Sequence, residues 1–263
     1  MESNILVCPK CKKKLFIINN SMECKNRHNY DLSKTGYVNL LNKKVNNIYE
    51  SQMMFSARRY VYNKNLFAPI IDYLKTVIQE ELDKSIVLEA GCGEGFLLSK
   101  LYESMNEKKF IGMDISKQAI NKAAKKNKDI IWFVGDLCSI PLEDKSVDII
   151  INMLTPANSA EFFRVLKNEG ILIKIVPSEQ HLLELRKRLK KDIYEKKDYG
   201  RSLSKNFGVI RKKSIKYKVE CDQEMKKNIF YMTPLTTKEN YVEFEENEIT
   251  VDLEIIIAKV KGR

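Results

Sequence analysis

Three cysteines and a histidine near the amino terminus have the residue types and the spacing of a metal site. Cys8 and Cys11 are separated by two residues, and Cys24 and His28 by three. A tetrahedral zinc ion takes two such pairs, because each pair sits on a tight turn and the metal closes the loop between them. Four protein ligands leave no open coordination position, so the sequence predicts one structural Zn²⁺ and no catalytic metal.

The same residues could instead be free thiols in a small β module, with His28 as an exposed polar side chain. Three of the six cysteines and one of the two histidines fall in this window, which favours the metal. Zinc would also supply folding energy that a module of roughly forty residues cannot gather from its own core. We expect the other cysteines, Cys92, Cys138 and Cys221, to be small apolar fillers.

A second candidate site is the glycine-rich turn Gly91-Cys92-Gly93-Glu94-Gly95, which follows a predicted strand and opens a predicted helix. Alternating glycines let backbone amides approach a ligand closely at the carboxyl end of a strand, where open α/β sheets bind cofactors. The spacing departs from the dinucleotide fingerprint, which seats a pyrophosphate on the helix terminus. The acids Glu89 and Glu94 disfavour phosphate and favour a ligand with an amine or a sulfonium.

Two more acids end the next two predicted strands. Asp114 lies nineteen residues after Gly95 and is placed to accept both hydroxyls of a ribose, whereas Asp136 would face an adenine. The glycine turn with Gly91 and Gly93, the ribose acid and the adenine-side acid, in this order, resemble the S-adenosylmethionine pocket of class I methyltransferases. The plain alternatives are a tight βα turn for the glycines, a helix cap for Asp114 and a solvated turn for Asp136.

These candidate residues need a scaffold, and the pattern after residue 86 provides one. Short apolar strands alternate with helices, which is typical of α/β proteins with a parallel, doubly wound sheet. The stretches 209–219 and 249–260 alternate in polarity and could add a hairpin-like pair at the sheet edge. The expected strands are 86–90, 110–114, 131–135, 147–152 and 171–176, and the expected helices are 96–104, 117–126, 159–166 and 179–190.

The texture of the chain predicts three parts. Residues 1–41 have few long periodic segments and hold the candidate metal ligands, so we assign them to a zinc ribbon. Residues 42–84 carry apolar residues at helical spacing and form a helical connection, with Pro69 as the break between two helices. Residues 85–263 form the cofactor-binding domain, with a Rossmann-like fold.

Composition and charge limit the possible functions. The 263 residues are 44% hydrophobic and 31% charged, which is ordinary for a globular protein. No secretory signal is readable at the start and no apolar run approaches the ~18 residues of a membrane span, so we expect a cytoplasmic protein that does not contact membrane.

The net charge of the chain is +11 and is unevenly distributed. It gathers in residues 1–50 (nine basic, four acidic) and 181–220 (fourteen basic, five acidic), which suits a polyanion such as nucleic acid. Compositional drift is the alternative.

Over nearly its whole length the chain resembles the bacterial 23S ribosomal RNA (guanine-N1) methyltransferases. The metal-ligand pattern, the glycine turn and the segment after Asp114 match, and generic small-molecule methyltransferases lack both the ribbon and the late histidine segment. Further matching residues are Tyr30, Asp31, Lys34, those in 36–41, Met53, Met54, those in 57–59, Pro69, Pro156, those in 164–167, Pro177, His181, Leu182, Glu184, Leu185 and those in 232–234.

The resemblance implies methylation of N1 of a guanine in a 23S rRNA hairpin loop, with the zinc ribbon recognising RNA and a homodimer possible. It also implies that Gly93, Glu94, Phe67 and His181 hold S-adenosylmethionine. Members of the family can carry Tyr at the position of Phe67, which leaves any polar contact there open. Without the resemblance, Phe67 would be a core residue of an amphipathic helix and His181 a helix-start residue.

No residue identifies itself as the base that removes the guanine N1 proton. His181, Asp148 and a water molecule are candidates, and the catalytic role stays unassigned. The sequence Asn152-Met153-Leu154-Thr155-Pro156 departs from the Asn-Pro-Pro-aromatic motif of enzymes that methylate exocyclic amines. Two other functions stay open: a class I methyltransferase for a small molecule, and a non-catalytic zinc-ribbon RNA-binding protein.

Overall fold

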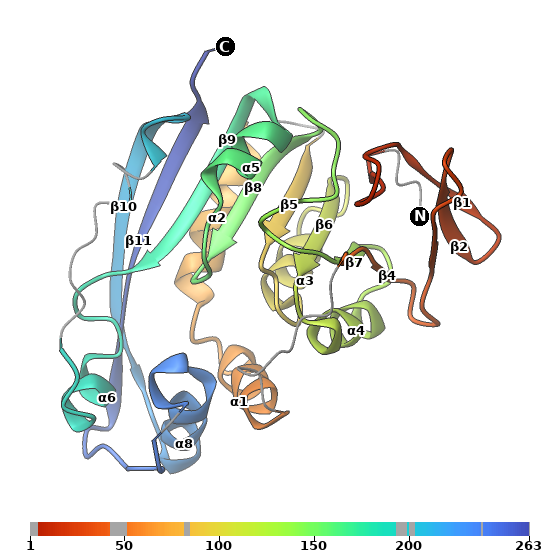
Figure 1. Cartoon of the computed structure of the whole chain (residues 1–263). Helices are drawn as coiled ribbons and strands as arrows, with labels where there is room; N and C mark the ends of the chain where they lie inside the picture. Colours follow the sequence, from red (N-terminus) through yellow and green to blue (C-terminus); the bar gives the residue numbers. More distant parts are fainter. Residues whose placement is uncertain are drawn as a thin grey trace.

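The computed structural model describes residues 5–42, 52–81, 85–192, 199, 203–237 and 239–262. An eight-stranded mixed sheet of order β10-β11-β9-β8-β5-β6-β7-β4 forms its centre (Figure 1). The strands from β4 to β9 are parallel, and β11 is antiparallel to both of its neighbours. The sheet consists of β4 (Val38–Asn39), β5 (Ile86–Ala90), β6 (Lys109–Asp114), β7 (Ile131–Val134), β8 (Val147–Met153), β9 (Leu166–Pro177), β10 (Phe207–Glu220) and β11 (Glu248–Val260).

Helices cover the sheet and its carboxyl-terminal edge. Helices α2 and α3 lie on one face and α5 on the other, while α1 and α8 pack side by side beyond the strand ends (Figure 1). None of the described helices is long and apolar enough to cross a membrane. The helices are α1 (Gln52–Asn63), α2 (Ala68–Glu81), α3 (Phe96–Tyr102), α4 (Lys117–Lys126), α5 (Ser159–Val165), α6 (Leu183–Arg188), α8 (Gln223–Met232) and the 3₁₀ turn η1 (Pro234–Thr236).

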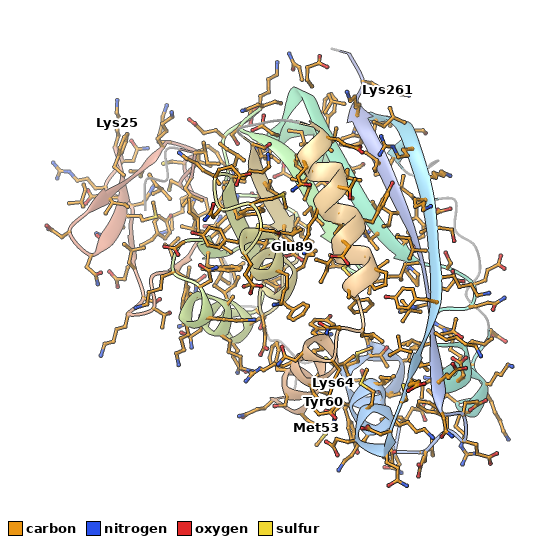
Figure 2. The ribbon with its side chains drawn as sticks, turned by 180° about the vertical axis from the view of Figure 1, so that it is seen from behind. Lys25, Met53, Tyr60, Lys64, Glu89 and Lys261 are labelled. Carbon is orange, nitrogen blue, oxygen red and sulfur yellow. The ribbon has the colours of Figure 1, made fainter. Side chains whose placement is uncertain are left out.

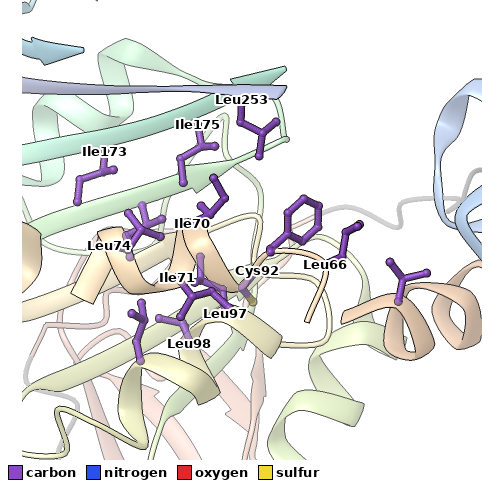
Figure 3. Packing of buried hydrophobic residues seen from close by; sticks show 14 of the residues in the cluster. Leu66, Ile70, Ile71, Leu74, Cys92, Leu97, Leu98, Ile173, Ile175 and Leu253 are labelled. Carbon is purple, nitrogen blue, oxygen red and sulfur yellow. The ribbon is translucent and has the colours of Figure 1, made fainter. Parts of the chain in front are cut away.

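Alternation along the strands divides the core into two clusters. Val87 packs with the α2 and α3 side of the sheet and its neighbour Leu88 with the α5 side, because successive side chains of a strand point to opposite faces. On the first face, Ile70 and Leu74 of α2 meet Ile173 of β9 in a dry layer (Figure 3). This layer fixes α2 over the strands that end at the candidate cofactor site.

The amino-terminal ribbon is a three-stranded antiparallel sheet of β1 (Leu15–Ile18), β2 (Ser21–Cys24) and β3 (Asn29–Asp31). Its core is not separate, since Leu6 and Met22 belong to the cluster on the α5 side of the large sheet. Leu6 also forms a β-bridge with Leu142, and β4 continues the ribbon chain as the last strand of the large sheet. The ribbon is therefore docked on the sheet by backbone pairing and by shared apolar burial.

The predicted α/β class and strand pattern are confirmed, with three differences. The expected helix 179–190 is shorter, because Leu182 has a left-handed backbone (φ 54°) and α6 begins only after it. Strand β9 begins earlier, at Leu166. The pair β10 and β11 is antiparallel as expected, but α8 lies between the two strands in sequence. Part of the connection (43–51 and 82–84) and part of the basic block (193–198 and 200–202) lie outside the described residues.

Candidate functional site

The four predicted metal ligands meet in the ribbon. Cys8, Cys11, Cys24 and His28 each offer a ligand atom, and these atoms all lie within 4.8 Å of one another. The Cys11 and Cys24 Sγ atoms are 3.6 Å apart, and His28 Nδ1 lies 3.3 Å from Cys8 Sγ and 3.5 Å from Cys24 Sγ. These separations match the edges of a tetrahedron whose centre is about 2.0–2.3 Å from each ligand, as zinc requires. The set therefore fits a structural Zn²⁺ ion.

Neighbouring groups support this site. The Tyr30 hydroxyl lies 3.2 Å from Cys8 Sγ and can donate to it, which orients a metal-bound sulfur. The turns that carry the ligands include residues with left-handed backbone, Lys12 (φ 59°) and Arg27 (φ 59°), so the tight turns expected from the spacing are present. Cys92, Cys138 and Cys221 lie outside the metal cluster. Cys92 and Cys221 are buried, as expected of apolar fillers, whereas Cys138 is exposed, so that expectation was wrong for Cys138.

The second site is a cavity of about 660 Å³ at the carboxyl ends of β5, β6 and β8. Its volume is in the range of small-molecule and cofactor sites. Helix α1, the start of α2, the glycine turn, α4, the segment after β8 and the segment before η1 all contribute to its wall. The predicted cofactor residues Phe67, Gly91, Gly93, Glu94, Asp114 and His181 all line it.

The glycine turn has the open backbone that its sequence predicts. Gly93 has a left-handed φ of 54°, and a Cβ atom there would meet nothing within 4 Å, so the backbone faces open space. Gly91 (φ 86°) is enclosed instead, because a Cβ atom there would lie 2.7 Å from the Thr155 side chain. At Gly93 the turn therefore exposes its backbone to the cavity, and at Gly91 it packs closely against Thr155 of the segment after β8.

Asp114, at the end of β6, connects two backbone segments at the cavity. Its Oδ2 atom accepts the Gly93 N–H at 2.8 Å, and its Oδ1 atom accepts the Ser116 N–H at 2.9 Å. A carboxylate oxygen can accept more than one hydrogen bond. The helix-cap alternative was wrong, because Ser116 caps α4 by accepting the Ala119 N–H, whereas Asp114 lines the cavity and fixes the glycine turn.

Glu89 is the most buried acid of the cavity wall. It is 4% exposed, and its Oε2 atom has no hydrogen-bond partner among the described residues. Burial, followed by repulsion from Asp114, raises the pKa of its carboxyl well above the usual range. Figure 2 shows Glu89 inside the molecule, whereas Lys25 projects from the outer side of the ribbon. A buried carboxyl with one unpartnered oxygen at this position fits the ammonium group of S-adenosylmethionine.

Glu94 ties α1 and α4 to the glycine turn. It accepts from Arg59 of α1 at 3.2 Å and from Lys122 of α4 at 2.7 Å. Lys122 also lies 4.2 Å from the centre of the Phe55 ring. The carboxylate is thereby held between two cations, and α1 is fastened over one side of the cavity.

The aromatic wall is larger than the sequence predicted. Phe67 is 4% exposed and makes an edge contact with Tyr62, at 5.4 Å between ring centres. Tyr62 in turn lies 5.0 Å from Phe96, and all three rings line the cavity. Sequence reasoning missed Tyr62 and Phe96, although the helical periodicity of α1 could have placed Tyr62 on the same side as Phe55.

His181 lines the cavity as a neutral ring. The Asp252 backbone N–H donates to its Nδ1 atom at 3.4 Å, so Nε2 carries the ring proton. Burial, with a smaller contribution from Arg186, lowers its pKa to about 3. In this state His181 can donate a hydrogen bond from Nε2, and its lowered pKa makes it a weak proton acceptor, which disfavours it as the base.

Two other acids lie away from the cavity. Asp148, near the start of β8, accepts from the Ile86 N–H at 2.9 Å and from Lys167 at 2.9 Å at the opposite edge of the sheet, so it was wrong as a candidate base. Asp136 lies two residues after the end of β7, and it is not among the residues that line the cavity. Its Oδ1 atom caps a turn by accepting the Cys138 N–H, so its contact with adenine stays a prediction.

The charge of the cavity rim was also missed. The sequence placed the net positive charge in residues 1–50 and 181–220, but α1 and α4 also bring cations together at the cavity mouth. Arg59 and two lysines of α4, Lys125 and Lys126, are exposed there. The interior acids Glu89 and Asp114 therefore suit a cationic ligand, while the rim suits an anionic one.

Comparisons with known proteins agree with both sites. A family model described as "RlmA, N-terminal", a zinc ribbon, matches residues 6–45, and a model described as "Methyltransferase domain" matches residues 87–170. A relative from Bacillus subtilis strain 168, YxjB, which bears the name of a 23S rRNA (guanine-N(1)-)-methyltransferase, is 32% identical over 98% of both chains. The chain belongs to this methyltransferase family.

Other similarities are more distant. A 23S rRNA (guanine(748)-N(1))-methyltransferase from Streptomyces fradiae is 28% identical and covers 70% of this chain and 69% of its own. The solved structure of MccD protein covers 73% of this chain and 96% of its own, with a TM-score of 0.51 and 16% identity. The YcgJ structure gives the same TM-score over 98% of its chain. These two structures show the Rossmann-like methyltransferase fold alone.

Proposed function

We propose that this protein transfers the methyl group of S-adenosylmethionine to N1 of a guanine in a hairpin loop of 23S rRNA. The observation that carries the proposal is the union, in a member of this family, of a docked zinc ribbon and a methyl-donor cavity with a cationic rim. The basic ribbon and the rim suit the phosphates of RNA, whose backbone charge dominates its affinity for proteins.

The cavity residues divide the work of holding the cofactor. When bound, S-adenosylmethionine supplies an electrophilic methyl group on sulfur. Asp114 accepts from the ribose hydroxyls, Glu89 receives the ammonium group, and the Gly93 backbone borders the methionine. Phe67 walls the cavity against water, and His181 donates from Nε2. We retain Asp136 as a proposed contact of the adenine.

The acceptor chemistry explains why the site is a deep cavity. Guanine N1 is protonated at neutral pH and lies on the base-pairing face, so the base must be unpaired or flipped to reach the donor. The bond from sulfur to methyl breaks as the bond from N1 to methyl forms; sulfur keeps the electron pair, and the N1 proton leaves to water. In-line positioning of N1 and the methyl group supplies most of the rate.

Primer extension tests the proposal directly, because N1-methylation blocks base pairing. Purified protein and S-adenosylmethionine should create one new reverse-transcriptase stop in unmodified 23S rRNA, at a loop guanine. Transfer of label only to small molecules would support a small-molecule methyltransferase instead. RNA binding without cofactor binding in calorimetry would support a non-catalytic RNA-binding protein. Either result would reject the proposed activity.

Location and assembly follow from the proposed substrate and from the family. An enzyme that acts on ribosomal RNA must work in the cytoplasm, which agrees with the expectation from the sequence. We also propose a homodimer, which the family resemblance makes plausible. Light scattering at micromolar concentration tests it, and a mass near 30.7 kDa, that of one chain, would reject it.

A further inference from the structure

A lysine is buried directly behind segment 152–156, whose residues Met153, Leu154 and Thr155 line one side of the cavity. Lys174 of β9 is 4% exposed, and its register partner on β8, Asn152, is fully buried. Both side chains lie on the α5 face of the sheet, because their strand neighbours Ile151 and Ile173 belong to the opposite cluster. The cavity is lined by Met153, the residue after Asn152, so the pair supports the cavity wall from the other face.

The pair forms a connected set of hydrogen bonds across three strands. The Lys174 Nζ atom donates to Asn152 Oδ1 at 2.5 Å and to the Thr155 carbonyl oxygen at 2.5 Å. The Asn152 amide donates to the Ala90 carbonyl oxygen at 2.8 Å and to the Pro156 carbonyl oxygen at 3.1 Å. The segment 152–156 is thereby tied to β9 through Lys174 and to the residue before the glycine turn through Asn152.

The placement of this lysine is costly for stability. Among the described residues, no carboxylate lies within ion-pair distance of Lys174, and burial lowers its pKa to about 8. A buried cation without a counter-ion is unfavourable, and an apolar residue would pack in the same layer without that cost. The benefits seen in the structure are the hydrogen bonds that hold segment 152–156.

Segment 152–156 contains a residue with a strained backbone conformation. Leu154 has a left-handed backbone (φ 51°), which is strained for a leucine, and its side chain is 39% exposed at the cavity. Its N–H donates to the Ile175 carbonyl oxygen at 3.0 Å. Thr155 presses against Gly91, where even a Cβ atom would clash. A shift of this segment would therefore change the distance between the glycine turn and the part of the cavity that Leu154 and Thr155 line.

We propose that Lys174 is a positioning residue for methyl transfer: with Asn152 it fixes segment 152–156 so that Leu154 and Thr155 hold the acceptor base in line with the methyl donor. The identity of that base as guanine rests on the proposed function. Lys174 does not line the cavity among the described residues, so it acts through the segment and does not touch the reacting atoms.

The test compares two lysines of the same strand. Lys174→Met removes the donors and keeps the length of the side chain, while Lys167→Met removes a half-buried lysine that pairs with Asp148 at the far edge of the sheet. We expect Lys174→Met to lower the single-turnover methylation rate 10- to 100-fold, since small misplacements cost that much, with the Kd of S-adenosylmethionine changed less than threefold. Lys167→Met should match the wild type in both. A wild-type rate in Lys174→Met, with cofactor binding intact, would overturn the proposal.

A double variant separates positioning from simple stability. Each single variant leaves the other member of the pair without its partner. Lys174→Met with Asn152→Leu should therefore lose less thermal stability than the sum of the two single losses, even though the Thr155, Ala90 and Pro156 carbonyl oxygens lose these donors. A positioning role predicts that its methylation rate stays at least tenfold low. Recovery of the rate together with stability would overturn positioning. This comparison also serves if Lys174→Met alone does not fold.

Hydrogen exchange gives a readout that needs no RNA. In Lys174→Met the amide of Leu154 should exchange at least tenfold faster, while amides of β5 should not change. Unchanged exchange at Leu154 would overturn the proposal whether or not rRNA is the substrate. Conversely, if the wild-type protein fails to methylate rRNA but the exchange result holds, the proposed function falls and the structural role of Lys174 stands.

Discussion

The Oδ2 atom of Asp114 accepts the backbone N–H of Gly93 at 2.8 Å, so the acid that ends β6 fixes the glycine turn that follows β5. The two parts of the predicted cofactor motif therefore form one unit. Parallel neighbours bring this about: β5 and β6 end at the same edge, with Ala90 opposite Met113 in register. A change at Asp114 acts on the ligand and on the turn together.

Asp114→Ala should weaken S-adenosylmethionine binding more than the removal of one ribose hydrogen bond would. We expect a 30- to 300-fold increase in Kd in calorimetry, or about 2.0–3.4 kcal/mol, because the Gly93 N–H also loses its acceptor. Asp136→Ala tests the proposed adenine contact in the same assay. Among the described residues, Asp136 makes no hydrogen bond with the Gly93 turn, so its loss should raise the Kd less, by about three- to tenfold for one hydrogen bond. A change below threefold would reject the contact with adenine.

Local spacing explains what could be predicted from the sequence. Cys8, Cys11, Cys24 and His28 meet because two short turns bring each pair together, and turns of this kind are readable from a few residues. The glycine turn was equally local. Asp148 was a poor choice of base, because the expected strand 147–152 already put it at the start of the strand, and open α/β sheets bind cofactors at the carboxyl end.

Long-range packing explains what could not. Tyr62 reaches the cavity because α1 packs against α8, which is about 170 residues later in the chain. In the sequence, Lys174 is a single polar residue in an apolar strand. Only the strand register, which places it opposite Asn152, shows which residue it hydrogen-bonds to. The ribbon was expected as a separate module, whereas Leu6 and Met22 belong to a cluster shared with the sheet.

Glu89 should release a proton when the cofactor binds. Its pKa is raised in the free protein, chiefly by burial, and a bound ammonium group would lower it. At pH values between the ordinary carboxyl pKa and the raised pKa, binding of S-adenosylmethionine therefore releases a proton, and its affinity rises with pH. Calorimetry at pH 6 in buffers of different ionisation enthalpy measures this release. Glu89→Gln should abolish it, and an unchanged release in that variant would assign the proton to another group.

The same carboxyl sets the pH dependence of the free protein's stability. The pKa of Glu89 is higher in the folded state than in the unfolded chain, so protonation of Glu89 stabilises the folded state. This contribution is complete at pH values below the ordinary carboxyl pKa. This contribution is lost as the pH rises through the raised pKa. The free energy of unfolding of cofactor-free protein should therefore fall less steeply with pH in Glu89→Gln than in the wild type.

Gly93→Val should block the cofactor without loss of RNA binding. The φ of 54° is strained for a β-branched residue, and the new side chain would project where the open backbone borders the cavity. We expect no binding of S-adenosylmethionine at 100 µM, set as about a hundredfold above a typical micromolar Kd, and RNA affinity within threefold of the wild type. Gly36→Val, at another left-handed glycine outside the cavity, is the control and should bind the cofactor normally.

Cys24→Ala should have the reverse effect. Loss of one ligand removes the stoichiometric zinc, and unfolding of the ribbon exposes part of the cluster that contains Leu6 and Met22. RNA affinity should fall at least tenfold and the melting temperature by several degrees, since ~2 kcal/mol shifts Tm by about 4–8 °C at this size. The Kd of S-adenosylmethionine should change less than threefold. Retained zinc by elemental analysis would contradict the ligand assignment. Cys138→Ala, at an exposed cysteine outside the cluster, is the control.

The lysines of β10 should contribute to RNA binding through charge. Lys212 and Lys213 are exposed on this edge strand, whereas their neighbour Arg211 is already paired with Glu80 at 3.2 Å. Charge reversal of both lysines to Glu should reduce the slope of log K against log salt by about 0.7–0.9 for each phosphate that is no longer neutralised. The control reverses Lys109 and Lys128, which are exposed at the start of β6 and just before β7, away from β10 in the sheet order. Equal slopes in the two double variants would mean that the basic strand acts only through net charge.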